Sequence, residues 1–390
     1  MVENGINRLS NPTLWAEEMV KSTFDLDEAL RLLGEDFPIR RIDEVLGNAI
    51  RQSAQKLEKT EAAARATLVE KLGPQNVSNW LRPGTNARID REKAIGIAFA
   101  LQMTYEEAEE FLKKCWLDGF YMRDVKDVIY RYCLKHGKDY DFATEMAESF
   151  AGLNDSDLSN PDPVGSGSRQ VRITIWLSDL TSAALSEEEL GKIIWQNEQF
   201  FGSFRRGAYE RFVELYNGLK QDQKEDAEKR YSIEEEDKDI FKISDEDICS
   251  MIVKGIPKIK GRGPNEVIRN CIAKYIPGRT GISEIINKAE RDGKIVEVDR
   301  KLFMLAWLAS KDGEVDDYLL SDDADVDFRE YISVLNSLLA TYGMAELDAR
   351  HPFDWILMNS IRCGFIPDEK NEWIEDIEER MRALIEKMKV

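Results

Sequence analysis

Apolar side chains recur every three or four residues along most of this chain, which is the spacing of helices that bury one face. Residues 42–50 contain one such stripe, and Val77, Trp80 and Leu81 form another. The Pro-Gly pair at 83–84 is a typical helix end. The pattern therefore predicts an all-α fold.

One segment departs from this helical spacing. In residues 169–177, RQVRITIWL, the apolar residues Val171, Ile173, Ile175 and Leu177 alternate with more polar ones. Strict alternation is typical of a strand that is buried on one face. We expect either a minor strand or hairpin near 170–177 or a further helix.

Composition suggests where the chain divides. Gly, Asn, Asp, Ser and Pro displace apolar residues between 152 and 168, as in a flexible linker. The predicted parts are an N-terminal helical arm at 1–40, a helical domain at 41–150, a linker at 151–168 and an acidic helical domain at 169–390.

Two distant segments resemble each other. Residues 112–137 match residues 339–364 without a gap, although identical residues are few and a chance match is the alternative. In each copy an arginine stands one helical turn before an aspartate. This spacing predicts two local ion pairs rather than a functional site, Arg123 with Asp127 and Arg350 with Asp354.

A third pattern points towards a biochemical task. The segment NVSNWLRPG, followed by REKAIGIAFALQMTYEEAEEFL, resembles the recognition helix and the two following helices of lambda-repressor-like (Xre-type) DNA-binding domains. The resemblance covers residues of about 40–115. It implies that the first of two helical domains is a five-helix domain of the helix-turn-helix class.

The same resemblance implies a set of DNA contacts. In that family the recognition helix lies in the major groove and its first residues reach base edges. By position, the base contacts would be Gln75, Asn76, Ser78 and Asn79, and the phosphate contacts would be Arg82, Arg88, Arg91 and Lys93. The turn before this helix is shorter than the family pattern, so the fold could instead serve contacts with protein or RNA.

Charge divides unevenly along the chain. The net charge is −20, and almost all of it lies on residues 138–390, because residues 1–137 are close to neutral. Nucleic-acid binding usually leaves a basic surface, so the near-neutral part is the better candidate. Beyond it, a second basic segment predicts a nucleic-acid or anion patch, or an internal partner for the acidic residues 220–247; its members are Lys254, Lys258, Lys260, Arg262 and Arg269.

Several classes of function lack their signals. No run of about 18 apolar residues and no leader pattern occurs, so we expect a cytoplasmic protein with no membrane contact. The five cysteines and two histidines lack metal-ligand spacing, so we expect no metal and no cofactor. Nucleophile-elbow, phosphate-loop and dinucleotide motifs are also missing, and we expect no enzymatic activity.

Together these observations predict a DNA-binding transcriptional regulator whose acidic helical domain senses a signal or binds a partner. The expected partner is double-stranded DNA, and a homodimer is left open. The alternative is a non-enzymatic helical interaction module, an adaptor or inhibitor, which uses a degenerate helix-turn-helix fold to contact protein or RNA.

Overall fold

The computed structural model describes most of the chain, and its described residues are helical or irregular, with no strand among them. The expected all-α fold is thereby confirmed. The described residues are 16, 20, 28–29, 31, 40–83, 89–150, 153, 168–201, 206–231, 243–257, 279–292, 296, 298–310, 324–363 and 377–387.

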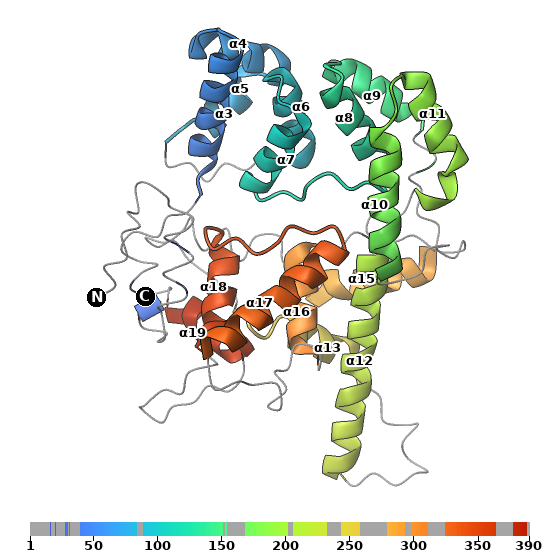
Figure 1. Ribbon diagram of the computed structural model, residues 1–390. Coiled ribbons are helices and arrows are strands. Elements are labelled where there is room, and N and C mark those ends of the chain that lie inside the picture. The colour runs from blue at the N-terminus through green and yellow to red at the C-terminus, as the bar shows by residue number, and fades with distance from the viewer. Residues whose placement is uncertain are drawn as a thin grey trace.

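The first helical unit lies in the upper part of Figure 1 and surrounds one hydrophobic core. Its first seven helices are connected by short segments, and α10 and α11 then complete the same core. The helices are α3 (Ile42–Lys56), α4 (Glu61–Leu72), α5 (Pro74–Trp80), α6 (Arg91–Ala100), α7 (Tyr105–Lys114), α8 (Val125–Lys135), α9 (Tyr140–Glu148), α10 (Ser168–Ser182) and α11 (Glu187–Gln196), with a 3-10 turn η2 (Glu198–Phe200).

The second unit lies below the first and has its own core. Ala16, Val20 and Ala29 from the predicted N-terminal arm pack into this second core rather than into the first one. The helices of the unit are α12 (Arg206–Tyr231), α13 (Asp245–Ile252), α15 (Arg279–Asp292), α16 (Arg300–Ala309), α17 (Ala324–Thr341), α18 (Pro352–Arg362) and α19 (Ile377–Lys387).

The division between the two cores falls later in the sequence than the predicted linker. The first core extends to Phe201 and the second resumes at Ala208, because α10 and α11 pack backwards onto the first unit. Of residues 151–168, only Leu153 and Ser168 belong to the described part. The segment rich in Gly, Ser and Pro therefore lies within the first unit's stretch of sequence.

The strand considered near 170–177 is a helix, α10. Leu177 is fully buried whereas Ile175 is 56% exposed, so the alternating apolar residues do not share one buried face. The fully buried positions are Leu177, Thr181 and Ala184, and half-buried Ile173 lies one turn before Leu177; these positions follow helical spacing. The segment is a helix because this face packs onto the first core. The alternation that suggested a strand arose because apolar residues such as Ile175 also occupy exposed positions.

A buried ion pair joins three elements of the first unit. Arg91, the first residue of α6, donates from both terminal guanidinium nitrogens to the Asp127 carboxylate, each at 2.9 Å, and also to the carbonyl oxygen of Gly119. The same carboxylate accepts the backbone N–H of Tyr121 at 2.7 Å. One guanidinium group thus holds the start of α6, the loop after α7 and the first turn of α8 together.

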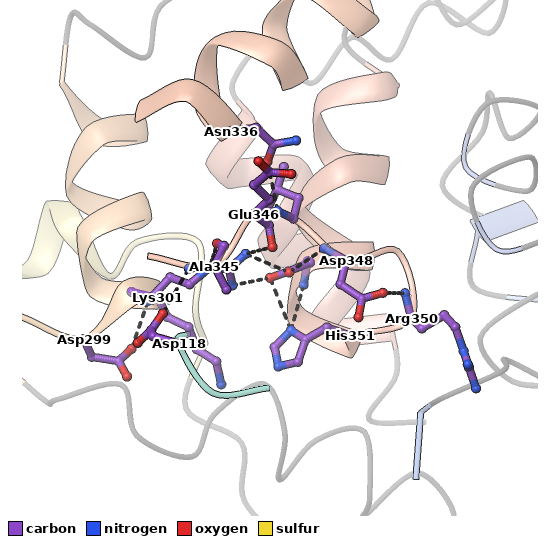
Figure 2. Close-up of polar contacts among 12 residues, drawn as sticks. Asp118, Asp299, Lys301, Asn336, Ala345, Glu346, Asp348, Arg350 and His351 are labelled. Carbon is purple, nitrogen blue, oxygen red and sulfur yellow. Dashed lines mark hydrogen bonds and ion pairs between the residues drawn. The ribbon is translucent and has the colours of Figure 1, made fainter. Parts of the chain in front are cut away.

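The second unit repeats this arrangement. Arg300, the first residue of α16, donates to both oxygens of Asp354 at 2.9 Å and to the carbonyl oxygen of Glu346 at 3.0 Å. Asp354 also accepts the backbone N–H of Asp348 at 2.9 Å (Figure 2). Asp354, Asp348 and Glu346 stand at the positions of Asp127, Tyr121 and Gly119 in the matched segments 112–137 and 339–364. Arg300 plays the part of Arg91, and both arginines lie outside these segments.

The loops themselves follow the same path. Trp116 and Gly343 occupy matching positions and both have positive φ, 61° and 67°. The next residue in each copy donates its N–H to the end of the preceding helix, Leu117 to Leu112 at 3.0 Å and Met344 to Leu339 at 2.9 Å. Shared backbone hydrogen bonds of this kind show that the two segments are one structural motif used twice.

The sequence predicted the wrong arginine as the partner of each aspartate. Asp127 and Asp354 take their bidentate partners from 36 and 54 residues earlier in the chain, not from one turn away. Arg123 instead donates from Nε to the carbonyl oxygen of Phe200 at 3.1 Å. Arg123 and Arg350 have the spacing for a local pair. The carboxylates nevertheless bind Arg91 and Arg300, because these arginines begin the helices that pack beside them.

We predict that Asp354→Ala destabilises the fold by about 3–5 kcal/mol, because it leaves the Arg300 charge buried without its partner. The matched control is Asp141→Ala, which removes an exposed ion pair with Lys71 and should change the unfolding free energy by less than about 1 kcal/mol. Urea titrations of both variants measure the difference. Equal midpoints would contradict a central role for this pair.

The pair also predicts an acid dependence. Burial alone would raise the pKa of Asp354, but the charge of Arg300, together with His351, outweighs it and holds the pKa far below its usual range. A lowered folded-state pKa gives stability above the unfolded value of about 3.9, and this stability is lost as the pH falls below it. Unfolding free energies should therefore drop from pH 5 to pH 3 more steeply in the parent chain than in Asp354→Asn.

Candidate functional site

Helix α5 follows α4 after a single residue, Gly73. This glycine has φ 85°, which side-chain-bearing residues rarely adopt, and its N–H donates to Val69 O at 3.0 Å to end α4. Pro74 then begins α5, where a missing N–H has no cost and the fixed φ favours a helix start. The Gly-Pro pair thus sets the angle between the two helices.

The buried face of α5 is the one that the sequence predicts. Val77 is fully buried, Trp80 is 4% exposed, and Leu81 is half-buried against the same core. On the opposite side, Gln75 and Ser78 are exposed, and Asn76 and Asn79 are half-buried. The predicted helix phase is confirmed, and two of the four predicted base-contact residues face solvent fully.

The other two side chains are engaged within the protein. Asn76 donates from Nδ2 to the carbonyl oxygen of Leu72 at 2.8 Å, which fixes the α4–α5 junction. Asn79 accepts through Oδ1 from Arg82 at 3.1 Å. Its amide is therefore oriented by an exposed arginine.

The residues predicted to contact phosphate fall into different environments. Arg82 is exposed directly after α5. Lys93 is half-exposed and pairs with Asp90 at 2.5 Å. Arg91 points inwards to Asp127 and serves the fold, and Arg88 lies outside the described residues. Of the three described residues, Arg82 is thus the best placed for a contact with the DNA backbone.

The second basic segment is described at one position. Lys254 pairs with Glu379 at 3.3 Å, an acid outside the residues 220–247 that were considered as internal partners. The other members, Lys258, Lys260, Arg262 and Arg269, lie outside the described residues.

A cleft of about 570 Å³ lies beside α3 and α7, and both Arg40 of the first unit and Arg350 of the second line it. Burial and the nearby Arg40 charge lower the pKa of Arg350. Other charges in the cleft are matched, as in the pair between Lys56 and Glu107 at 2.7 Å. The cleft therefore carries no large excess of one charge.

Neither a candidate metal cluster nor a reactive thiol at Cys115 or Cys133 occurs in the described part of the chain. No group of three or more His, Cys, Asp or Glu side chains there could hold a metal ion. Burial raises the pKa of Cys115 and of Cys133 to about 12, which keeps both thiols protonated and unreactive. No helix in the described part is long and apolar enough to span a membrane.

Comparisons with protein-family models, with curated proteins and with solved structures found no match for this chain. The candidate site therefore rests on the geometry of α4, α5 and α6 and on the resemblance of their sequence.

We predict that Trp80→Ala destabilises the protein by about 3–5 kcal/mol, since the indole fills the core beneath α5 and its removal leaves a cavity. Gln75→Ala, on the exposed face of the same helix, is the matched control and should change stability by less than about 0.5 kcal/mol. Thermal or urea unfolding measures both. An unchanged Trp80→Ala variant would show that α5 does not pack as described.

Proposed function

We propose that this protein is a DNA-binding regulator that reads duplex DNA with the exposed face of α5, while its second unit senses a signal or binds a partner. The observation that carries the proposal is the combination of a buried Val77–Trp80 stripe with exposed Gln75 and Ser78. A short helix held by one apolar face, with amide and hydroxyl groups on the other, is suited to base edges.

Local charge supports the same reading. The chain has 74 acidic residues, yet none stands between Lys71 and Ile89, the stretch that contains α5. A phosphate backbone approaching this stretch meets Arg82 and no carboxylate within it. The net charge of −20 on the whole chain repels non-specific DNA, so a stretch of sequence without acids favours binding in one orientation.

The side chains have distinct expected roles. Gln75 can donate and accept with an adenine through N6 and N7, and Ser78 can bond either a donor or an acceptor. Arg82 can contact phosphate while it orients Asn79 through their 3.1 Å hydrogen bond. Base contacts would give specificity and the arginine would give affinity.

We predict that Gln75→Ala weakens binding to a preferred duplex by about 1–3 kcal/mol and leaves binding to random duplex unchanged. Arg82→Ala, in contrast, should weaken both and reduce the slope of log affinity against log salt by about one. Fluorescence anisotropy at several salt concentrations separates the two effects. Equal loss on both duplexes for Gln75→Ala would exclude it as a base contact.

A selection from random duplexes at about 50 mM salt supplies the preferred sequence and tests the proposal as a whole. Enrichment of a motif with the full chain, and its loss with Gln75→Ala and Ser78→Ala together, is expected. If the folded parent chain enriches no motif, the DNA-binding proposal fails.

In that event the interaction-module alternative takes its place. It is favoured by one observation, the exposed apolar side chains on α10, where Ile175 is 56% and Trp176 is 44% exposed. Trp176 also packs edge-on against Phe200, which holds the indole in a fixed orientation at the surface. Aromatic residues of this kind are enriched in protein interfaces.

A further inference from the structure

The repeated motif extends beyond the two loops. In the first unit α4 packs on α5 and α6, and α9 packs on α6 and α8; in the second, α13 packs on α15 and α16, and α19 packs on α16 and α18. The helix order α4, α5, α6, α7, α8, α9 thus corresponds to α13, α15, α16, α17, α18, α19. Six helices of the second unit thus repeat the order and these contacts of six helices in the first.

The correspondence holds at the level of residues where α6 and α16 begin. Each helix has an aspartate N-cap whose carboxylate accepts a backbone N–H, Asp90 from Lys93 and Asp299 from Lys301. The residue before each cap is fully buried, and the residue after it is the arginine of the buried ion pair; the matched sets are Ile89, Asp90 and Arg91, and Val298, Asp299 and Arg300.

Helix α15 takes the place of α5. The sequence GPQNVSNWL from Gly73 matches GRTGISEII from Gly278, and the buried positions coincide. Val77 and Ile282 are both fully buried, and Trp80 and Ile285 are 4% and 9% exposed. The second unit therefore contains a second helix in the reading position.

The outward faces of these two helices differ. Glu284 is exposed on α15, and Asn287 donates its amide to the Ser283 hydroxyl at 3.1 Å. The corresponding stretch of the first unit has no acid. A carboxylate on this face repels the phosphate backbone, so α15 is unsuited to the role that we assign to α5.

The two units meet through equivalent positions. The Asp118 carboxylate in the loop after α7 accepts the N–H of Ala345 at 3.0 Å, and these two residues are counterparts in the repeat (Figure 2). Contact between counterpart positions is the mark of a twofold axis, as in the symmetric interface of a homodimer.

Neighbouring contacts surround this point. Trp116 of the first loop packs edge-on against His351 of the second, with ring centroids 5.0 Å apart. In return, Tyr121 of the first loop covers Gly343 so closely that a Cβ there would lie 2.8 Å from its ring. The two loops are thus well packed against each other, and the pair between Arg40 and Asp348 and the packing of α10 on α17 add further contacts between the units.

We propose that the second unit is a built-in dimer partner: it occupies, through residues 342–351, the surface by which a second chain would pair, and it lacks a reading helix suited to DNA. The full chain is accordingly a monomer. Insofar as the proposed function holds, this monomer reads one half-site with α5, and its preferred DNA sequence is not a palindrome.

A palindromic site is expected only for a regulator with two equivalent reading helices. Two identical reading helices related by a twofold axis require two half-sites about 34–36 Å apart. A chain that carries one suitable helix beside one acidic helix contacts a single half-site. Its affinity then depends on one reading surface and the backbone contacts around it.

Light scattering on the full chain, from about 1 to 100 µM, tests the first part without DNA. We predict a constant mass of 44.8 kDa. A mass that doubles within this range overturns the inference, whatever the outcome of the DNA selection.

A variant of the second loop tests whether the covered surface of the first unit can pair with another chain. A Cβ on Gly343 would lie 2.8 Å from the Tyr121 ring, so Gly343→Val should separate the two units, expose the unaltered loop surface of the first unit and cause a concentration-dependent doubling of mass. Gly137→Val is the matched control, because Gly137 has a similar positive φ of 63° but nothing within 4 Å of the added Cβ, and this variant should remain monomeric.

Separation is read independently from the emission of Trp116, which should shift to longer wavelength as the indole leaves His351; a Trp116→Phe background identifies this signal. A Gly343→Val chain that shows the shift and stays monomeric overturns the inference. For the DNA part, an enriched palindrome with two half-sites contradicts it, and a single asymmetric motif supports it. Failure to enrich any motif rejects the proposed function, and the mass measurements alone then decide the inference.

Discussion

Each unit depends on one buried charge pair. The Asp127 and Asp354 side chains are at most 2% exposed, so each carboxylate loses nearly all of its hydration and must be compensated within the protein. The arginine at the start of a neighbouring helix provides this compensation with two parallel hydrogen bonds, Arg91 in one case and Arg300 in the other. Because the same guanidinium also binds a loop carbonyl, it fixes the path of the loop, and the two loops form part of the contact between the units.

Local features were predictable from the sequence, since they depend on spacing along one helix. The stripe of Val77 and Trp80 is buried as expected, because helical phase alone determines which side chains face the core. The partner of Asp127 was not predictable in this way. An arginine one turn away satisfies the local rule, but Arg91 is brought to the carboxylate only when α6 packs beside α8, which is a property of the whole unit.

The repeat was visible in part for a related reason. Residues 112–137 and 339–364 match without a gap because the loop inside them is constrained by the same hydrogen bonds, so no residue can be inserted without breaking them. Outside this segment the connections between helices differ in length. The residues of α5 and α15 therefore match at a different offset in the sequence from the residues of the two loops. The buried residues of α5 and α15 are all apolar but not identical, as with Trp80 and Ile285. Their equivalence is recognised from their burial and from the order of the helices.

Two units with the same helix order can carry different surfaces. The buried positions of α5 and α15 are constrained alike because both must fill a core beneath the helix. Their outward-facing positions are not, so Asn79 on α5 and Glu284 at the matching position of α15 can differ without cost to either core. The interface through Asp118 and the N–H of Ala345 keeps the units together while their outward faces diverge. A covalently linked pair removes the concentration dependence of dimer formation, because the partner unit is always present at a high effective concentration.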